Sequence, residues 1–395
     1  MQKPLTERER ITRTLRGEEV DVLPWATRLD IWHMASIRSG TLPADMVDVP
    51  LMALHRRFGI GRQSYSRLTK LKLNRVDLQI TFNGEVIHEE SNPVMHFPLP
   101  ADLVPLDGPG DTVMTFKSPA GRAKLRFRTN EILIREAAAP YLMEHVLKGD
   151  GDFSVVQWIV DHAEPVADYA EFEAREAEIG DDGFTIGTLV RVPFQQVMLD
   201  YMGEESAVYA MMDSRRDVER LLSALGEQTR RVFDLGLESP AFMLEFTDNF
   251  EGSITSPRLF REHCIPFMQE IADRVHAAGR VLGSHMDGNM KPLLNLVPEC
   301  GIDVVESFSP SPLTQLTFEE AWAAWKGKVL MWGVIPSPIF EPHVPESDFV
   351  AWMEDMMRLL DGDQRIILGI GDQALRPTIT ERIQRVSEML GRTLP

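Results

Sequence analysis

Residues 280–289 read Arg-Val-Leu-Gly-Ser-His-Met-Asp-Gly-Asn, and this stretch sets the fold that we expect. A short apolar run ends there in His285 and Asp287, and Gly288 then permits a sharp turn. Side chains two residues apart on a strand point to the same side, so the imidazole and the carboxylate can reach into one pocket or onto one metal ion. The alternative is a loop in which Asp287 caps a helix over residues 290–296.

Three later segments repeat the pattern of an aliphatic or β-branched run that ends in a polar or glycine-containing turn. They are residues 301–308, 329–336 and 365–372. Segments with helical periodicity separate them, and the one before the opening stretch, residues 258–278, follows Ser256-Pro257, a plausible N-cap and first-turn pair. Strands that alternate with helices in this way predict a βαβ series.

The alternation continues upstream, which favours a closed barrel. We expect strands at residues 184–189 and 241–246, a helix at 214–235, and the first strand within residues 22–30. No G-x-G-x-x-G motif follows a strand, as a dinucleotide-binding fold would prefer. The sequence therefore predicts an α/β protein, a (β/α)₈ TIM-type barrel, with residues 1–395 forming a single domain.

The N-terminal third is organised differently, because its apolar residues alternate. We predict an antiparallel β insertion over about residues 73–128, with hairpin turns at Asn83-Gly84 and around residues 119–121. Such an insertion can cover the mouth of the site or form an interface.

Polar side chains stand at or just beyond the ends of the expected strands, where a barrel carries its active site. These candidates are Glu245, Asp248, His285, Asp287, Glu306 and Asp372.

Composition narrows the class of protein. A net charge of −19 disfavours nucleic acid and anionic membranes as partners, because the electrostatic contribution to such binding would be repulsive. No apolar run approaches the roughly 20 residues that span a bilayer, and the N-terminus lacks an apolar signal region, so we expect a cytoplasmic protein. The two cysteines, Cys264 and Cys300, lack metal-motif spacing and fit a reducing compartment as buried small side chains.

Several short patterns in a fixed order resemble the uroporphyrinogen decarboxylase superfamily, which includes cobalamin-dependent methyltransferases that act on corrinoid proteins. The patterns are Leu-Arg-Gly-Glu at 15–18, Leu-Pro-Trp at 23–25, Pro193-Phe194 with Gly203, Ser256-Pro257, His285 with Gly288-Asn289, and Gly301-Ile302-Asp303. The resemblance covers most of the chain and is weak in the insertion.

The chain departs from the decarboxylase itself. That enzyme resembles this chain but carries an Arg-Gln-Ala-Gly-Arg-Tyr segment after the first strand, whose arginines receive the carboxylates of the tetrapyrrole. Here the segment reads Arg28-Leu29-Asp30-Ile31-Trp32, so only Arg28 matches. A substrate with eight carboxylates needs several guanidinium partners, and the difference speaks against porphyrinogen decarboxylation.

The methyltransferase branch that activates thiols places zinc on a His-x-Cys pair and a later Cys. By resemblance, His285 matches the histidine, Asp287 stands where the first Cys would be, and Asp372 stands near the place of the later one. A set of nitrogen and oxygen ligands holds zinc or a harder ion such as manganese or magnesium.

The resemblance therefore implies an enzyme that moves a methyl group between a small methylated substrate and a corrinoid protein. A divalent metal, with zinc as the first choice, would be held by His285, Asp287, Glu245 and Asp372, and Asp248 is a further candidate. Without a metal, His285 and Asp287 would donate protons to the leaving group. Arg28 would also act in catalysis, and Trp25, Glu306 and Trp332 would contact the substrate.

The cobalamin is expected on a partner protein, because the Asp-x-His-x-x-Gly signature of cobalamin carriers is absent from the sequence. A homodimer is a further expectation. Two rival hypotheses remain: a decarboxylase or lyase that binds a small carboxylic acid through Arg28, and a non-catalytic barrel that binds a ligand.

Overall fold

The computed structural model describes residues 4–392 and 394, which divide into two compact units. The first unit holds the chain as far as Ser66, the segment Ala170–Thr188 and the chain from Pro240 onward. The second holds Arg67–Tyr169 and Leu189–Ser239. In this described part, no helix combines the length and the apolar character that crossing a membrane requires.

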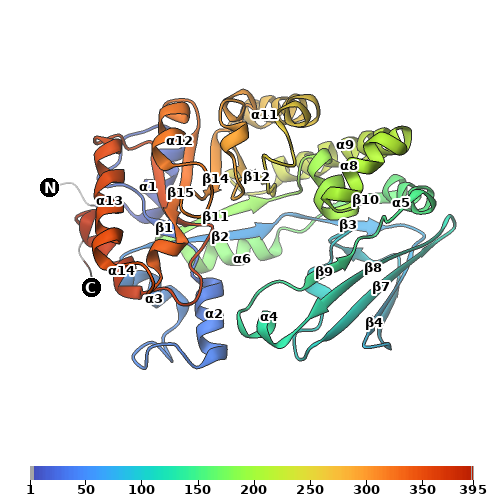
Figure 1. Cartoon of the computed structure of the whole chain (residues 1–395), viewed down its shortest axis with the longest axis horizontal. Helices are drawn as coiled ribbons and strands as arrows, with labels where there is room; N and C mark the ends of the chain where they lie inside the picture. The colour runs from blue at the N-terminus through green and yellow to red at the C-terminus, as the bar shows by residue number, and fades with distance from the viewer. Residues whose placement is uncertain (1–3, 393, 395) are drawn as a thin grey trace. The chain divides into compact units, whose positions relative to one another are not determined.

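Eight parallel strands form the barrel of the first unit, as the sequence predicts (Figure 1). In spatial order they are β1 (Ala26–Thr27), β2 (Gly61–Arg67), β11 (Gly183–Thr188), β12 (Met243–Phe246), β13 (Val281–His285), β14 (Val304–Phe308), β15 (Leu330–Pro336) and β16 (Ile366–Gly371). The last strand returns to the first, because the Leu368 amide donates to the Pro24 carbonyl at 2.9 Å and Trp25 bridges to Leu368. The sheet is therefore an almost closed cylinder.

The first strand is shorter than expected. The sequence predicts it within residues 22–30, whereas β1 contains only Ala26 and Thr27. Pro24 has no amide hydrogen to donate to a ladder, and helix α2 already begins at Asp30. The strand β2 was not predicted at all, because its sequence, Gly-Arg-Gln-Ser-Tyr-Ser-Arg, contains no aliphatic residue.

Helices surround the barrel, and Figure 1 shows α12, α13 and α14 on the outside of the last strands. The helices of this unit are α1 (Glu7–Leu15), α2 (Asp30–Ser39), α3 (Leu51–Phe58), α6 (Ala170–Ile179), α10 (Pro257–Leu259), a π-helical turn (Phe260–Cys264), α11 (Ile265–Ala277), α12 (Phe318–Trp325), α13 (Glu346–Leu360) and α14 (Thr380–Met389). The side chain of Ser256 caps α10, as its position before Pro257 predicts. The helix expected at 290–296 is only a 3₁₀ turn, Lys291–Leu293.

The lower part of the barrel is filled by an apolar cluster with members from β1, β11, β12, β13, β14, β15 and β16. Its strand residues are Ala26, Phe184, Ile186, Met243, Val281, Val304, Trp332 and Ile367, and Ile11 of α1 joins them. Residues from strands on all sides can share one cluster only inside the cylinder. Because side chains alternate along a strand, residues two positions further along each strand also point inward.

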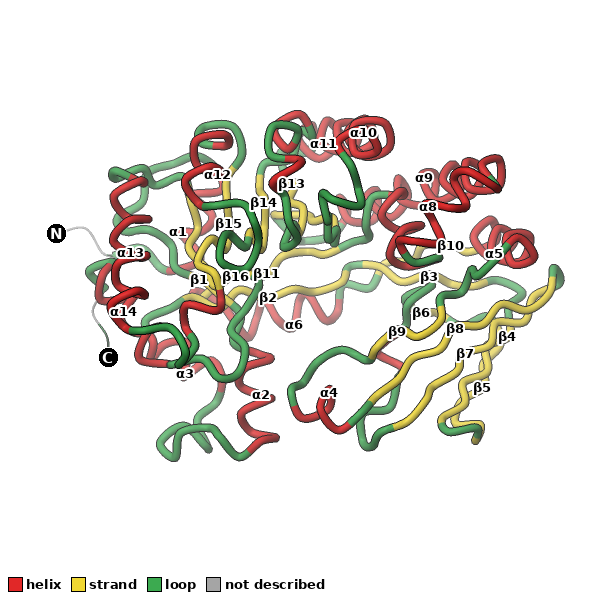
Figure 2. Tube along the Cα trace, viewed as in Figure 1, coloured by secondary structure: helices red, strands yellow, loops and turns green. Residues whose placement is uncertain are grey.

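The second unit contains two antiparallel sheets, and Figure 2 shows the five strands of the larger one side by side. Its order is β5 (Glu85–Ser91), β4 (Asp77–Phe82), β7 (Gly110–Ser118), β8 (Gly121–Thr129) and β9 (Tyr141–Glu144). The smaller sheet orders β10 (Ala163–Ala167), β3 (Thr69–Leu73) and β6 (Val94–Met95). Both predicted hairpins are present, and Asn83 and Gly84 adopt the positive φ angles of 50° and 89° that such a turn requires.

This unit is larger than the predicted insertion at about 73–128. It also contains β9, β10 and the helices α4 (Glu131–Arg135), α5 (Asp150–His162), α7 (Pro193–Gln195), a π-helical turn (Gln196–Tyr201), α8 (Glu204–Asp213) and α9 (Arg215–Glu238). The two added strands are short, and Pro165 interrupts the pattern of β10. Their sequences therefore carry little alternation that could predict them.

Candidate functional site

Three neighbouring strands each carry an ionisable side chain near the carboxyl end of the barrel. Glu245 lies on β12, His285 ends β13 and Glu306 lies on β14. His285 and Glu306 face each other in the parallel register. Each acid or imidazole stands two or four residues beyond an apolar member of the core cluster on the same strand, so all three point inward.

Glu306 and His285 are joined by a short hydrogen bond. Nδ1 of His285 lies 2.6 Å from Oε2 of Glu306. The other carboxylate oxygen of Glu306 accepts the Tyr65 hydroxyl and the Gln63 amide, each at 2.5 Å. Gln63 and Tyr65 are two residues apart on β2 and therefore share its inner face.

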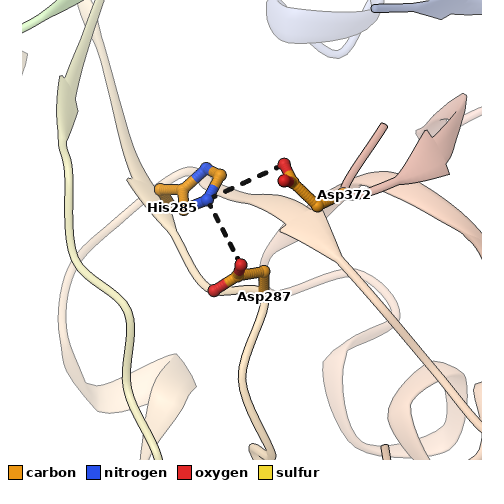
Figure 3. Close-up of side chains that lie close together, drawn as sticks. All are labelled: His285, Asp287 and Asp372. Carbon is orange, nitrogen blue, oxygen red and sulfur yellow. Dashed lines mark ion pairs between the residues drawn. The ribbon is translucent and has the colours of Figure 1, made fainter. Parts of the chain in front are cut away.

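The second nitrogen of His285 faces two aspartates, as Figure 3 shows. Nε2 lies 3.7 Å from Oδ2 of Asp287 and 3.9 Å from Oδ1 of Asp372. Among the described residues, His285, Asp287 and Asp372 form the group whose ligand atoms, all within 4.8 Å of one another, could hold one metal ion. The same-face prediction for His285 and Asp287 thus brings both to one place, and the last strand supplies the third member.

Asp372 is fixed by side chains from two other strand ends. Arg28, just beyond β1, donates to Oδ1 of Asp372, and the Ser307 hydroxyl donates to the same oxygen at 2.6 Å. Ser307 has a positive φ of 61° and sits at an irregularity in the β14–β15 register, which turns its side chain toward Asp372. The Arg28 guanidinium also stacks over the Tyr65 ring, 4.3 Å from its centre.

Electrostatics favour charged forms of His285 and Asp372. Burial on its own lowers the pKa of His285, but the carboxylates of Glu306 and Asp287 outweigh burial and hold this pKa well above its ordinary value. Burial on its own raises the pKa of Asp372, but Arg28, His285 and Ser307 outweigh it and keep this pKa below its ordinary value. In the metal-free site these shifts favour the protonated imidazole of His285 and the ionised carboxylate of Asp372.

Glu245 behaves differently from the other acids. It is buried, and its Oε1 has no hydrogen-bond partner among the described residues. Burial, followed by the nearby Glu306 carboxylate, raises the pKa of Glu245 well above its ordinary value, which favours the neutral carboxyl. Glu245 therefore lies beside the site, but outside the group of three that can share an ion.

Three other predicted residues lie away from this group. Asp248 is buried and accepts a hydrogen bond from Ser284, which faces the opposite side of β13 from His285. Trp332 belongs to the apolar cluster, and its Nε1 donates to the Ala26 carbonyl at 3.1 Å. Trp25 is fully buried and precedes the inward-facing Ala26, so it points out of the barrel. The structure thus places both tryptophans in packing positions.

Three residues of the site escaped the sequence analysis: Gln63, Tyr65 and Ser307. The first two lie on β2, whose sequence Gly-Arg-Gln-Ser-Tyr-Ser-Arg is polar throughout, so no apolar pattern marks it as a barrel strand or distinguishes its inner face. Ser307 reaches the site only because of its positive φ angle, for which a serine gives no sequence signal.

The geometry suits a divalent cation. Two ligands at about 2.1 Å from a tetrahedral ion are roughly 3.4 Å apart, close to the separations from Nε2 of His285 to the two aspartates. Asp287 and Asp372 keep 26% and 28% of their side chains exposed, so this side of the group is open to a ligand. A nitrogen and two carboxylates can bind an ion, or can exchange protons with a bound molecule.

Comparison with known proteins gives a family and a fold. The model of the family described as Uroporphyrinogen decarboxylase (URO-D) matches residues 137–389, well over half of the chain. A methyltransferase from Methanosarcina mazei has a similar solved structure, with a TM-score of 0.58 and 16% identity over 98% of each chain. No curated protein sequence matches this chain. His285, Asp287 and Asp372 all lie within the residues matched by the family model.

Proposed function

The chain belongs to the uroporphyrinogen decarboxylase (URO-D) family, and we propose that it is a methyltransferase of that family. In this proposal it takes a methyl group from a small methylated substrate and passes it to a corrinoid protein. A methyltransferase is also among the proteins that share its fold.

The observation that carries the proposal is the grouping of His285, Asp287 and Asp372. These three residues stand where the resemblance puts the histidine and the two cysteines of the zinc-dependent branch. They are separated by up to 87 positions in sequence, from 285 to 372, yet their ligand atoms lie within 4.8 Å of one another. Such convergence at the carboxyl end of a barrel is expected of an active site.

The charges of the site also fit a divalent metal. Asp287, Asp372 and Glu306 bring three carboxylates close to His285, and one guanidinium, that of Arg28, offsets them. When bound, a divalent ion would act as a Lewis acid on the heteroatom that carries the methyl group. We therefore assign His285, Asp287 and Asp372 as its ligands, and zinc as the first ion to test.

The rest of the site would orient these ligands and restrict access. Arg28 and Ser307 hold one oxygen of Asp372, and the packed cluster around Trp332 closes the lower end of the barrel to water. A substrate would enter from the side on which Asp287 and Asp372 remain partly exposed.

The proposed reaction needs only the methylated substrate, one proton and the reduced corrinoid. The methyl group leaves the substrate heteroatom, which keeps the electron pair of the broken bond and takes up one proton. The methyl group is accepted by the reduced corrinoid of a partner protein, whose electron pair forms the new bond.

The structure gives less support to decarboxylation. Arg28, the residue that would bind a substrate carboxylate, already pairs with Asp372 and stacks on Tyr65. Its charge is therefore offset within the protein, and residues 29–32, which follow it, lack the second arginine of the decarboxylase's segment.

An assay of methyl transfer tests the proposal. The purified protein would be incubated with reduced free cobalamin and a panel of methyl ethers, methylamines and methyl thiols, and the absorbance of the cobalamin followed. We expect transfer from one of these classes, its loss in Asp287→Ala, and its retention in His343→Ala, a control whose side chain is 64% exposed. Formation of coproporphyrinogen from uroporphyrinogen, with no methyl transfer from any compound, would contradict the proposal.

A further inference from the structure

Glu306 uses both of its carboxylate oxygens within the protein. Tyr65 and Gln63 donate to Oε1, and His285 approaches Oε2 through Nδ1 at 2.6 Å. The side chain is only 1% exposed. A carboxylate with both oxygens engaged and almost no exposed surface is poorly placed to bind a substrate, which was the role expected from the sequence.

The hydrogen bond between Glu306 and His285 fixes which nitrogen of the imidazole is free. A carboxylate only accepts hydrogen bonds, so Nδ1 of His285 must carry the proton. In the neutral imidazole, Nε2 then holds the lone pair, and a metal or a proton can bind there. The opposite tautomer would set the Nδ1 lone pair against a carboxylate oxygen, which is repulsive.

The carboxylate that selects this tautomer is itself held in place. Tyr65 meets the His285 ring edge-on, with ring centres 6.1 Å apart, while its hydroxyl donates to Glu306. The Arg28 guanidinium lies over the ring of Tyr65, 4.3 Å from its centre. The chain of contacts from Arg28 through Tyr65 to Glu306 therefore leaves His285 little freedom to rotate or to flip.

The fixed ring points Nε2 at the two aspartates. Nε2 lies 3.7 Å from Asp287 and 3.9 Å from Asp372, whereas Glu306 meets the other ring nitrogen, Nδ1. A histidine that donates its second ring hydrogen to a carboxylate is a recurring arrangement at metal centres, because it orients the ring and makes the free nitrogen a better ligand.

From this geometry we propose that Glu306 is a positioning residue, supported by Tyr65 and Gln63, that sets the tautomer and direction of His285 for binding a metal at Nε2. The inference rests on the proposed function because it requires a bound metal. The hydrogen bond between Glu306 and His285, however, is formed without a metal.

Binding of Co²⁺ tests the role of Glu306, since the visible absorption of this ion reports its ligand geometry. Glu306→Gln should weaken Co²⁺ binding by about 10-fold to 100-fold and alter the spectrum. Tyr65→Phe should weaken binding by a smaller factor than Glu306→Gln, because the Gln63 amide still donates to Glu306. Glu245→Gln is the matched variant, a buried glutamate on the adjacent strand and outside the group of three. Equal Co²⁺ affinity and an unchanged spectrum in Glu306→Gln would overturn the proposal, as would a larger loss in Glu245→Gln.

A measurement without metal separates this inference from the proposed function. In the metal-free protein labelled with ¹⁵N-histidine, the Nδ1 proton of His285 should give a downfield, slowly exchanging NMR signal because Glu306 accepts it. The signal should vanish in Glu306→Gln and persist in Glu245→Gln. If the wild type bound no Co²⁺ but showed this signal, the metal assignment would fail while the positioning contact stood. If it lacked the signal, the positioning role would be wrong even with Co²⁺ bound.

Should Glu306→Gln fail to fold, as judged by circular dichroism, Tyr65→Phe carries the test, because it removes one hydroxyl and keeps the ring. The proposal would be contradicted if Tyr65→Phe kept both the NMR signal and the Co²⁺ affinity of the wild type, and if a folded Glu306→Ala variant also bound Co²⁺ with unchanged affinity.

Discussion

Two levels of side chains fill the barrel, and the same strands build both. The lower level is apolar, with Met243, Val281 and Val304 at the first positions of β12, β13 and β14. The upper level, two or four residues further along, carries Glu245, His285 and Glu306. Since each residue advances a strand by about 3.3 Å, a few ångströms separate a packed core from a charged site. Substitutions should divide accordingly into those that cost stability and those that cost chemistry.

The largest effect is expected at the upper level. Asp287→Ala and Asp372→Ala should each lower methyl transfer by about 100-fold or more, because each removes a proposed ligand of the Lewis acid. The midpoint of thermal unfolding of Asp287→Ala should stay within a few degrees of the wild type, since this side chain is partly exposed. Asp372→Ala should lower the midpoint further, because it leaves the Arg28 guanidinium without its carboxylate partner. Initial rates and calorimetry measure the two quantities. If either variant lowered the unfolding midpoint strongly but left the rate of methyl transfer unchanged, the division into a structural lower level and a chemical upper level would be wrong.

The complementary effect is expected at the lower level. Trp332→Ala should reduce the free energy of unfolding by about 3–5 kcal/mol, because it empties a large volume in the core cluster. Urea denaturation of the metal-loaded protein measures it. The remaining folded fraction should still bind metal, since Trp332 packs in the apolar cluster and its Nε1 donates to the Ala26 carbonyl. Loss of metal binding with normal stability would show that Trp332 belongs to the site after all.

Gly283 lies on β13 between Val281 and His285, at the boundary between the apolar lower level and the polar upper level. A methyl group there would stand 2.3 Å from the Met243 terminal carbon and 3.6 Å from Oε1 of Glu245. Gly283→Ala should therefore cost about 1–3 kcal/mol of stability through overpacking and should also lower methyl transfer, because Met243 must move beneath the site. A change in only one of these quantities would mean that the two levels are mechanically independent.

The last expected effect, which is measured in the metal-free protein, is a dependence of stability on pH. The pKa of His285 is raised on folding, so its contribution is fully present below the pKa of an unfolded histidine and is lost as pH rises through the folded value. A charged hydrogen bond of this kind contributes about 1.5–3 kcal/mol. Unfolding free energies of the wild type and His285→Gln, measured from pH 6 upward, should therefore converge. A difference that grows with pH would contradict the assigned charge state.

The contrast between the two levels also explains what the sequence could reveal. Apolar runs such as 281–285 and 366–371 predicted the barrel, because burial leaves a periodic trace. His285, Asp287 and Asp372 were found because each follows such a run. The polar strand β2 leaves no apolar trace, so Gln63 and Tyr65 were missed.

The direction in which a side chain points was harder to predict from the sequence than the position of its residue near a strand. Asp248 follows β12 and Trp25 precedes β1, and both point away from the group of three. Asp248 accepts from Ser284 on the outer face of β13, and Trp25 stands next to the inward-facing Ala26. Glu306 was identified as a site residue, yet its role depends on Tyr65, which is 241 positions away in sequence. Which side chains donate hydrogen bonds to a buried carboxylate is decided only when the barrel has folded, so the sequence does not reveal it.

The metal content of the purified protein tests the central claim most directly. The wild type, expressed with zinc, manganese and magnesium available and then analysed by mass spectrometry, should carry about one divalent ion per chain. His285→Ala and Asp287→Ala should each carry far less, whereas His343→Ala, whose histidine is exposed, should match the wild type. A folded wild type without a divalent ion under these conditions, or an unchanged metal content in both site variants, would contradict a metal centre at His285, Asp287 and Asp372.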